Sequence, residues 1–193
     1  MTSLESTIKV FPPEALRTHA SSKVQLAVQD AAELYASQYR RYTELPYVTH
    51  PYGVAMRLLN IGADEPTLIA ALFHSALDMN AGMSASMLRR QYGEEVLSLV
   101  LPLTEGPALA GVPRAERKRL YRERLIAAEP RVHDIKLADI IDSLDGIVHA
   151  DLRLAKVYLP DHEALVKGLV KGHPALQQEA RHTFTRERSR LKR

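Results

Sequence analysis

The chain has 193 residues, a formal net charge of +3 and 46% hydrophobic residues. These values are typical of a globular protein, and so small a positive excess does not by itself indicate a nucleic-acid-binding protein. The absence of cysteine excludes disulfides and thiolate metal ligands. We find no apolar run of membrane-spanning length and no signal-peptide pattern, so we expect a cytoplasmic protein that does not insert into membranes.

Helical periodicity dominates the sequence, and no stretch alternates with the period of two that is typical of a strand. The predicted fold class is therefore all-α. We expect a lead-in over residues 1–22, one domain over 23–160, and C-terminal helices with a basic tail over 161–193, packed on that domain. The first long helix is predicted over 23–41, with Arg40 and Arg41 in its last turn.

The segment 46–51, PYVTHP, predicts the start of a second helix, over 50–61. Pro51 suits the first turn of a helix, where its missing N–H is not needed. His50 then lies at the helix N-terminus, and Val54, Leu58 and Ile61 continue its face towards the core. This places a histidine at the edge of a buried surface.

The segment 68–80, LIAALFHSALDMN, predicts a buried helix that runs to about Leu77. On such a helix Ala70, Ala71, His74 and Asp78 share one face, because residues three and four apart are neighbours. A single histidine beside an apolar stripe is more often a hydrogen-bonded core residue than a metal ligand. Further ligands elsewhere in the chain are needed to favour a metal site.

A third segment, KLAD at 136–139, lies in an apolar helix predicted over 132–148. Asp139 leans on the apolar stripe of that helix, and a buried carboxylate needs a cation, donors or a metal as its partner. Two imidazoles and this carboxylate would suit zinc, iron or manganese. Asp142 and Asp145 are expected to be exposed, although Asp142 could approach the site from the adjacent flank.

The remaining helices are predicted over 85–92, 94–103, 114–128, 161–171 and 174–191. The helix over 114–128 is rich in charge, which is consistent with a solvated face or with attraction of polyphosphate, and Lys118 is its residue most worth testing. The last helix is strongly basic; it is either solvated or a surface for phosphate, and it lacks a recognised nucleic-acid-binding motif.

The order of the motifs PYVTHP, LIAALFHSALDM, YGEEV and KLAD resembles that of HD-domain phosphohydrolases. Within them, the chain is similar to the small stand-alone RelA/SpoT-type hydrolases of guanosine tetraphosphate (ppGpp). This resemblance implies an all-α HD-domain helical bundle that binds Mn²⁺ and a guanine nucleotide and releases the 3′-pyrophosphate. It assigns His50, His74 and Asp139 to the metal, Asp78 to positioning or deprotonating water, and Arg40, Arg41, Lys136 and Ser143 to the nucleotide or the order of the site.

The chain departs from the family pattern at three positions. Ser75 stands where the family has the aspartate of its His-Asp pair, Met79 replaces the second acid of the catalytic pair, and Ser143 replaces an asparagine. A neutral hydroxyl removes both a negative charge and a strong oxygen ligand from a divalent ion. For Arg40 and Arg41 the alternative remains two solvated charges at a helix end.

Three hypotheses follow from these patterns. The chain is a metal-dependent phosphohydrolase acting on ppGpp or a related nucleotide; or it is a degenerate HD domain that binds a nucleotide or protein without turnover, for which Ser75 and Met79 argue. The third hypothesis is a helical adaptor whose basic C-terminal helix meets acidic partners. Self-association into a homo-oligomer is left open.

Overall fold

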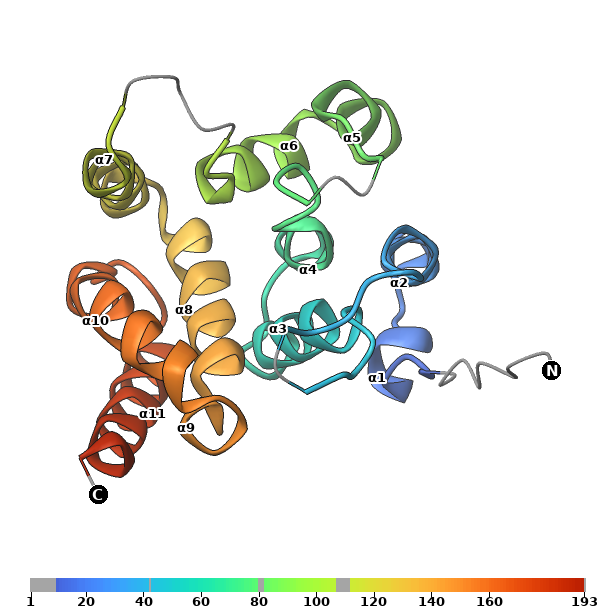
Figure 1. Cartoon of the computed structure of the whole chain (residues 1–193). Coiled ribbons are helices and arrows are strands. Elements are labelled where there is room, and N and C mark those ends of the chain that lie inside the picture. Colours follow the sequence, from blue (N-terminus) through green and yellow to red (C-terminus); the bar gives the residue numbers. More distant parts are fainter. Residues whose placement is uncertain (1–9, 42, 80–81, 107–111, 193) are drawn as a thin grey trace, which may run out of the picture.

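The computed structural model describes residues 10–41, 43–79, 82–106 and 112–192 (Figure 1). Within these ranges the chain forms helices and no strand; the one isolated bridge pairs Tyr39 with Pro46. The helices are α1 (Glu14–Arg17), α2 (Ser22–Leu34), α3 (Thr49–Asn60), α4 (Glu65–Phe73), α5 (Ala85–Tyr92), α6 (Glu94–Val100), the 3₁₀ helix η1 (Leu101–Leu103), α7 (Arg114–Ala127), α8 (Pro130–Leu144), α9 (Ile147–Ala150), α10 (Leu152–Gly168) and α11 (Pro174–Leu191). The predicted all-α class is confirmed.

Side-chain caps fix several helix starts. The side chains of Ser21, Asp64 and Ser84 each accept a hydrogen bond from the backbone N–H three residues later. Such caps satisfy backbone donors that have no partner within the helix. The starts of α2, α4 and α5 are therefore encoded locally in the sequence.

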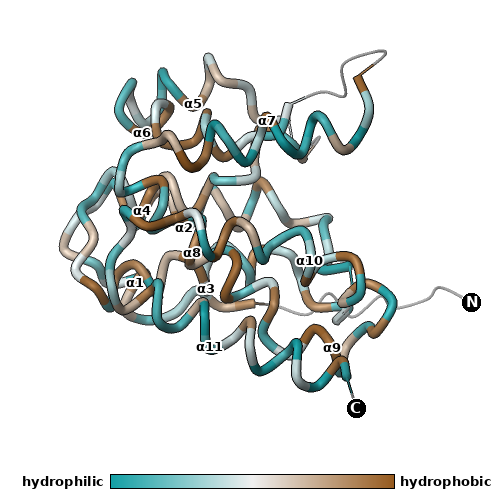
Figure 2. The backbone as a smooth tube through the Cα atoms, turned by 90° about the vertical axis from the view of Figure 1, so that its left-hand side faces the viewer, coloured by the Kyte–Doolittle hydropathy of each residue, from teal (hydrophilic) through white to brown (hydrophobic). Residues whose placement is uncertain are grey.

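Helix α8 is the central element, with its most extensive contacts to α3 on one side and α11 on the other (Figure 1). Helix α4 packs on α3, α2 and α6. Figure 2 shows α4 hydrophobic along most of its length, whereas α7 and α11 are largely hydrophilic. Residues Leu68–Phe73 of α4 are all buried, so this helix belongs to the core and fixes the chain that follows it.

Several predicted boundaries are wrong. Helix α2 ends at Leu34, so Arg40 lies outside it, in the segment that bridges back through Tyr39 and Pro46. Helix α8 ends at Leu144 because Gly146 adopts a left-handed φ of 75°, which stops the helix predicted to reach residue 148.

Two more corrections concern the site. Helix α4 ends at Phe73 and is followed by turns, so His74 and Asp78 do not share a helical face as predicted. Helix α10 begins at Leu152, well before the predicted start at 161, and continues through Pro160.

Leu16 of α1 is fully buried, so part of the segment expected as a lead-in packs on the core. Among the described helices, we find none with the length and apolarity needed to cross a membrane.

Candidate metal centre and its cavity

His74 is held at the carboxyl end of α4. The buried helix brings it into the interior, where it is 6% exposed. Its Nδ1 lies 2.7 Å from the carbonyl oxygen of Ala71. Because a carbonyl can only accept, Nδ1 carries the proton and Nε2 of the neutral ring presents a lone pair. Burial, followed by the neighbouring His50, lowers the pKa of His74 to about 4, against the opposing charge of Asp139.

His50 lies in the first turn of α3 and is also 6% exposed. Its Nδ1 is 2.8 Å from Oδ2 of Asp142 on α8. A carboxylate accepts this bond, so the Nδ1 of His50 is the protonated nitrogen and its Nε2 is free to act as a ligand. Helices α3 and α4 thus direct two imidazole lone pairs to one place.

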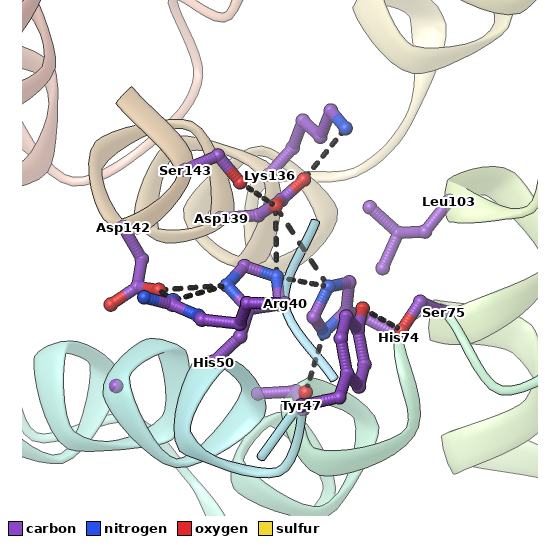
Figure 3. A network of polar contacts seen from close by, with 12 residues as sticks. Arg40, Tyr47, His50, His74, Ser75, Leu103, Lys136, Asp139, Asp142 and Ser143 are labelled. Carbon is purple, nitrogen blue, oxygen red and sulfur yellow. Dashed lines mark hydrogen bonds and ion pairs between the residues drawn. The ribbon is translucent and has the colours of Figure 1, made fainter. Parts of the chain in front are cut away.

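Asp139 of α8 completes this cluster (Figure 3). The two Nε2 atoms of His50 and His74 are 3.2 Å apart, and Oδ1 of Asp139 lies 3.3 Å and 3.9 Å from them. Ligand atoms bound about 2.0–2.2 Å from one ion stand roughly 3–4 Å apart. With both imidazoles neutral, the two Nε2 lone pairs and Oδ1 of Asp139 converge on one place, which fits a divalent cation.

Lys136 forms a buried ion pair with Asp139, Nζ to Oδ2 at 2.7 Å. Burial acts against both charges, but their mutual attraction is stronger: the pKa of Asp139 lies well below its usual value and that of Lys136 is raised. Ser143 donates to Oδ1 of the same carboxylate at 3.2 Å. Asp139 is therefore held ionised, with one oxygen directed to the histidines.

Asp142 is not exposed: its side chain is 13% exposed, and the alternative that it approaches the site is confirmed by its contact with His50. It forms an ion pair with Arg40, and its Oδ1 lies 3.2 Å from Arg57 on α3. The contact with His50 depends on how α3 packs on α8, which the sequence does not state. The predicted exposure of Asp145 is confirmed, since its side chain is 57% exposed.

Ser75 lies next to Tyr47, with 2.8 Å between the two hydroxyl oxygens (Figure 3). Burial raises the pKa of Tyr47 to about 12, with the hydrogen bond to Ser75 acting in the opposite direction. The pair is therefore neutral. It contributes no negative charge at the position where the resembled family has a carboxylate.

Asp78 has a different environment from the one its predicted role requires. Its two carboxylate oxygens accept hydrogen bonds from the backbone N–H groups of Glu105 and Gly106, at 2.8 Å and 2.9 Å. Asp78 therefore holds the segment after η1 against the wall of the cavity. Its predicted action on water stays a prediction.

A cavity of about 750 Å³ opens over the cluster, between its three side chains and the helices α7 and α10. Its lining includes six residues that the sequence analysis singled out: Arg41, Ser75, Asp78, Met79, Lys136 and Ser143. Among the described residues the lining has seven Arg or Lys and four Asp or Glu: Arg40, Arg41, Arg114, Arg117, Lys118, Arg122 and Lys136 against Asp78, Glu105, Asp139 and Asp161. This excess favours an anionic ligand such as a phosphorylated molecule.

The sequence singled out Lys118, and it lies in this wall in an ion pair with Glu105. Sequence analysis missed the contribution of α10, from which Tyr158, Asp161 and His162 line the cavity. The helix was predicted to start only at residue 161, directly after Pro160, whereas α10 runs through that proline.

Comparison with known proteins agrees with this geometry. The family model of the HD domain matches residues 27–158. A guanosine-3′,5′-bis(diphosphate) 3′-pyrophosphohydrolase of Aquifex aeolicus is 31% identical over 143 residues, which cover 73% of this chain and 19% of that protein. The enzyme of the same name called MESH1, from Xenopus tropicalis, is 28% identical over 166 residues, covering 82% of this chain and 90% of its own length.

A solved structure, described as a metazoan ortholog of SpoT that hydrolyses ppGpp, superposes with a TM-score of 0.74. It is 27% identical, and the match covers 88% of this chain and 97% of that one. The chain spans about a fifth of the length of two other relatives, the Aquifex aeolicus enzyme and a probable GTP pyrophosphokinase of Mycobacterium leprae, at 19% each.

Proposed function

Because this chain belongs to the HD domain family, we propose that it is a metal-dependent hydrolase that releases the 3′-pyrophosphate from ppGpp or a related guanine nucleotide. The observation that carries this proposal is the convergence of His50, His74 and Asp139 within 4.8 Å beneath a cavity with an excess of cations. Relatives of similar length and fold bear the name of this activity.

The proposed ligands are the two Nε2 atoms and Oδ1 of Asp139, and the proposed ion is Mn²⁺. A divalent ion there supplies a Lewis acid that activates water and polarises a phosphoryl oxygen. Lys136 keeps the Asp139 carboxylate ionised. Arg41, exposed at the cavity, is proposed to meet the phosphates of the nucleotide, since its planar fork suits them.

Arg40 and Ser143 are proposed to order the site. Arg40 pairs with Asp142 beside His50, and Ser143 donates to Asp139. Asp78, proposed to position or deprotonate water, is tested by Asp78→Asn. A loss of turnover with an unchanged position of the segment after η1 would support its action on water.

A second function, nucleotide binding without turnover, is favoured by two residues of the cavity. Ser75 brings no charge to the centre, and Met79 lines the cavity with a side chain that cannot carry a proton. The loss of one ligand would weaken the centre by at least the roughly 10- to 100-fold known for outer partners of metal ligands. Both functions use the same cavity, so turnover is what separates them.

The deciding experiment is ppGpp hydrolysis by the purified chain with added Mn²⁺, beside the variant Ser75→Asp/Met79→Asp. Turnover by the unmodified chain that a chelator abolishes would support the hydrolase. Nucleotide binding without turnover, together with turnover in the double variant, would support the binding function. Cytoplasmic localisation and self-association stay predictions.

A further inference from the structure

The centre is contacted by a carboxylate that its ligand set does not use. Asp142 lies one helical turn after Asp139, and its Oδ2 accepts the Nδ1 proton of His50 at 2.8 Å. Arg40 and Arg57 contact the same carboxylate, Arg57 at 3.2 Å through Oδ1. The two arginines hold Asp142 so that one oxygen faces the imidazole.

Helix α3 leaves room for this carboxylate. A Cβ at Gly53 would collide with Oδ1 of Asp142 and lie 3.1 Å from its Cγ. Glycine within a helix is destabilising relative to alanine, and nothing about the backbone at Gly53 requires it. The close approach of Asp142 is therefore a physical reason for glycine here.

We propose that Asp142 is a positioning residue that sustains metal binding by His50 in a centre where Ser75 supplies no negative charge. The inference rests on the metal centre of the proposed function. A carboxylate on the outer nitrogen of a ligating imidazole fixes its tautomer and orientation and makes the ligating nitrogen more basic. Because Arg40 and Arg57 balance its charge, Asp142 acts on the ion through the orientation and basicity of His50.

The first test is the Mn²⁺ affinity of metal-free protein, measured by electron paramagnetic resonance of free Mn²⁺ without any nucleotide. Asp142→Asn is expected to weaken binding by roughly 10- to 100-fold. Asp145→Asn is the matched control: its side chain is 57% exposed and pairs with Arg186 away from the cluster. An affinity of Asp142→Asn within about twofold of the unmodified chain, with an intact helical spectrum, would overturn the proposal.

A second test separates compensation from a purely structural role. Asp142→Asn is compared in two backgrounds, the unmodified chain and Ser75→Asp. If Asp142 compensates for Ser75, Ser75→Asp alone strengthens Mn²⁺ binding by about tenfold or more, and Asp142→Asn then weakens it less than in the unmodified chain. Equal losses in both backgrounds would show that Asp142 acts independently of Ser75 and would contradict the proposed compensation.

Gly53→Ala tests the same idea without removing a charge, in case Asp142→Asn does not fold. The added methyl group displaces the carboxylate, so Mn²⁺ affinity is expected to fall as in Asp142→Asn. Gly168→Ala in α10 is the matched control, because its methyl group would meet Ile126 outside the centre. Unchanged Mn²⁺ affinity in Gly53→Ala would count against the proposal.

These outcomes are distinct from those of the hydrolysis assay. Mn²⁺ binding that depends on Asp142 as described, in a chain that does not turn over ppGpp, would contradict the proposed hydrolase and leave this inference standing. Full turnover and unchanged Mn²⁺ affinity in Asp142→Asn would contradict this inference and leave the proposed hydrolase standing.

Discussion

Among the residues that the structure describes, the carboxylates of Asp139 and Glu187 are buried in opposite situations. Glu187 on α11 is fully buried, and each of its contacts is a donor: the backbone N–H of Val148 at 3.3 Å, Arg186 at 3.1 Å and Arg190 at 2.5 Å. Asp139 is 8% exposed and has donors too, but its Oδ1 also faces the acceptor nitrogens of two histidines.

A candidate metal ligand differs from a structural charge in what faces its oxygens. Burial and an ion pair are common to both carboxylates, so neither identifies a site. Acceptors that face acceptors are unfavourable unless a cation lies between them. The Asp139 cluster therefore has a place for an ion, whereas the charge of Glu187 is already balanced by protein donors.

The largest effect is expected for Lys136→Met. It leaves Asp139 buried without its cation, so the free energy of unfolding should fall by about 3–5 kcal/mol in metal-free protein. Added Mn²⁺ should recover more stability in this variant than in the unmodified chain. Chemical denaturation measures both effects, with Lys167→Met, 74% exposed on α10, as the control. A loss below about 1 kcal/mol would show that Asp139 does not depend on Lys136.

His74→Ala should weaken Mn²⁺ binding by about 100-fold or more, because it removes a proposed ligand and not merely an outer partner. Turnover of ppGpp should fall with metal occupancy. Equilibrium dialysis against Mn²⁺ measures the change, and the exposed His149→Ala is the control. Equal Mn²⁺ affinity in His74→Ala and His149→Ala would show that the cluster of His50, His74 and Asp139 does not hold the ion. Asp139 would then be a structural charge like Glu187.

Glu187→Gln should lower the free energy of unfolding by about 2 kcal/mol, since hydrogen bonds to a charged group are lost. Mn²⁺ affinity should stay unchanged, because α11 contributes nothing to the cluster. Thermal melts and the same dialysis measure the two quantities. A change in Mn²⁺ affinity would show that the two carboxylates are coupled.

The smallest effect is the pH dependence of that loss. Burial raises the pKa of Glu187, but donors led by Arg186 and Val148 outweigh it, so the net pKa lies below its usual value. Its contribution is complete above the unfolded pKa of about 4.3 and disappears as the pH falls through the lower folded pKa. The stability difference between the unmodified chain and Glu187→Gln should therefore shrink in that acidic window. If this stability difference stayed constant across the acidic window, the titration of Glu187 would not contribute to the pH dependence of stability.

Local patterns in the sequence predicted the all-α class and the order of most helices. The cap at Ser84 is local, and the helix start at residue 85 was correctly expected. The helix predicted to continue past Phe73 instead gives way to turns, and α10 continues through Pro160 because packing outweighs the missing hydrogen bond.

For the site, too, the sequence predicted the residues better than the contacts that depend on packing. His50, His74 and Asp139 were named from motifs, and the structure brings them together; their role as ligands stays a prediction. Asp142 could not be assigned, because its contact with His50 depends on the packing of α3 on α8 and on the space at Gly53. Asp78 was placed on a helical face that does not exist.

The cluster joins distant parts of the polypeptide, since His50 and His74 precede the connection between η1 and α7 and Asp139 follows it. A single proteolytic cut between Leu103 and Arg114 would give two fragments, each with an incomplete ligand set. Tight ion binding would then report reassociation of the fragments, as in a split-protein sensor. During synthesis on the ribosome, too, the centre can be completed only after α8 has emerged and docked.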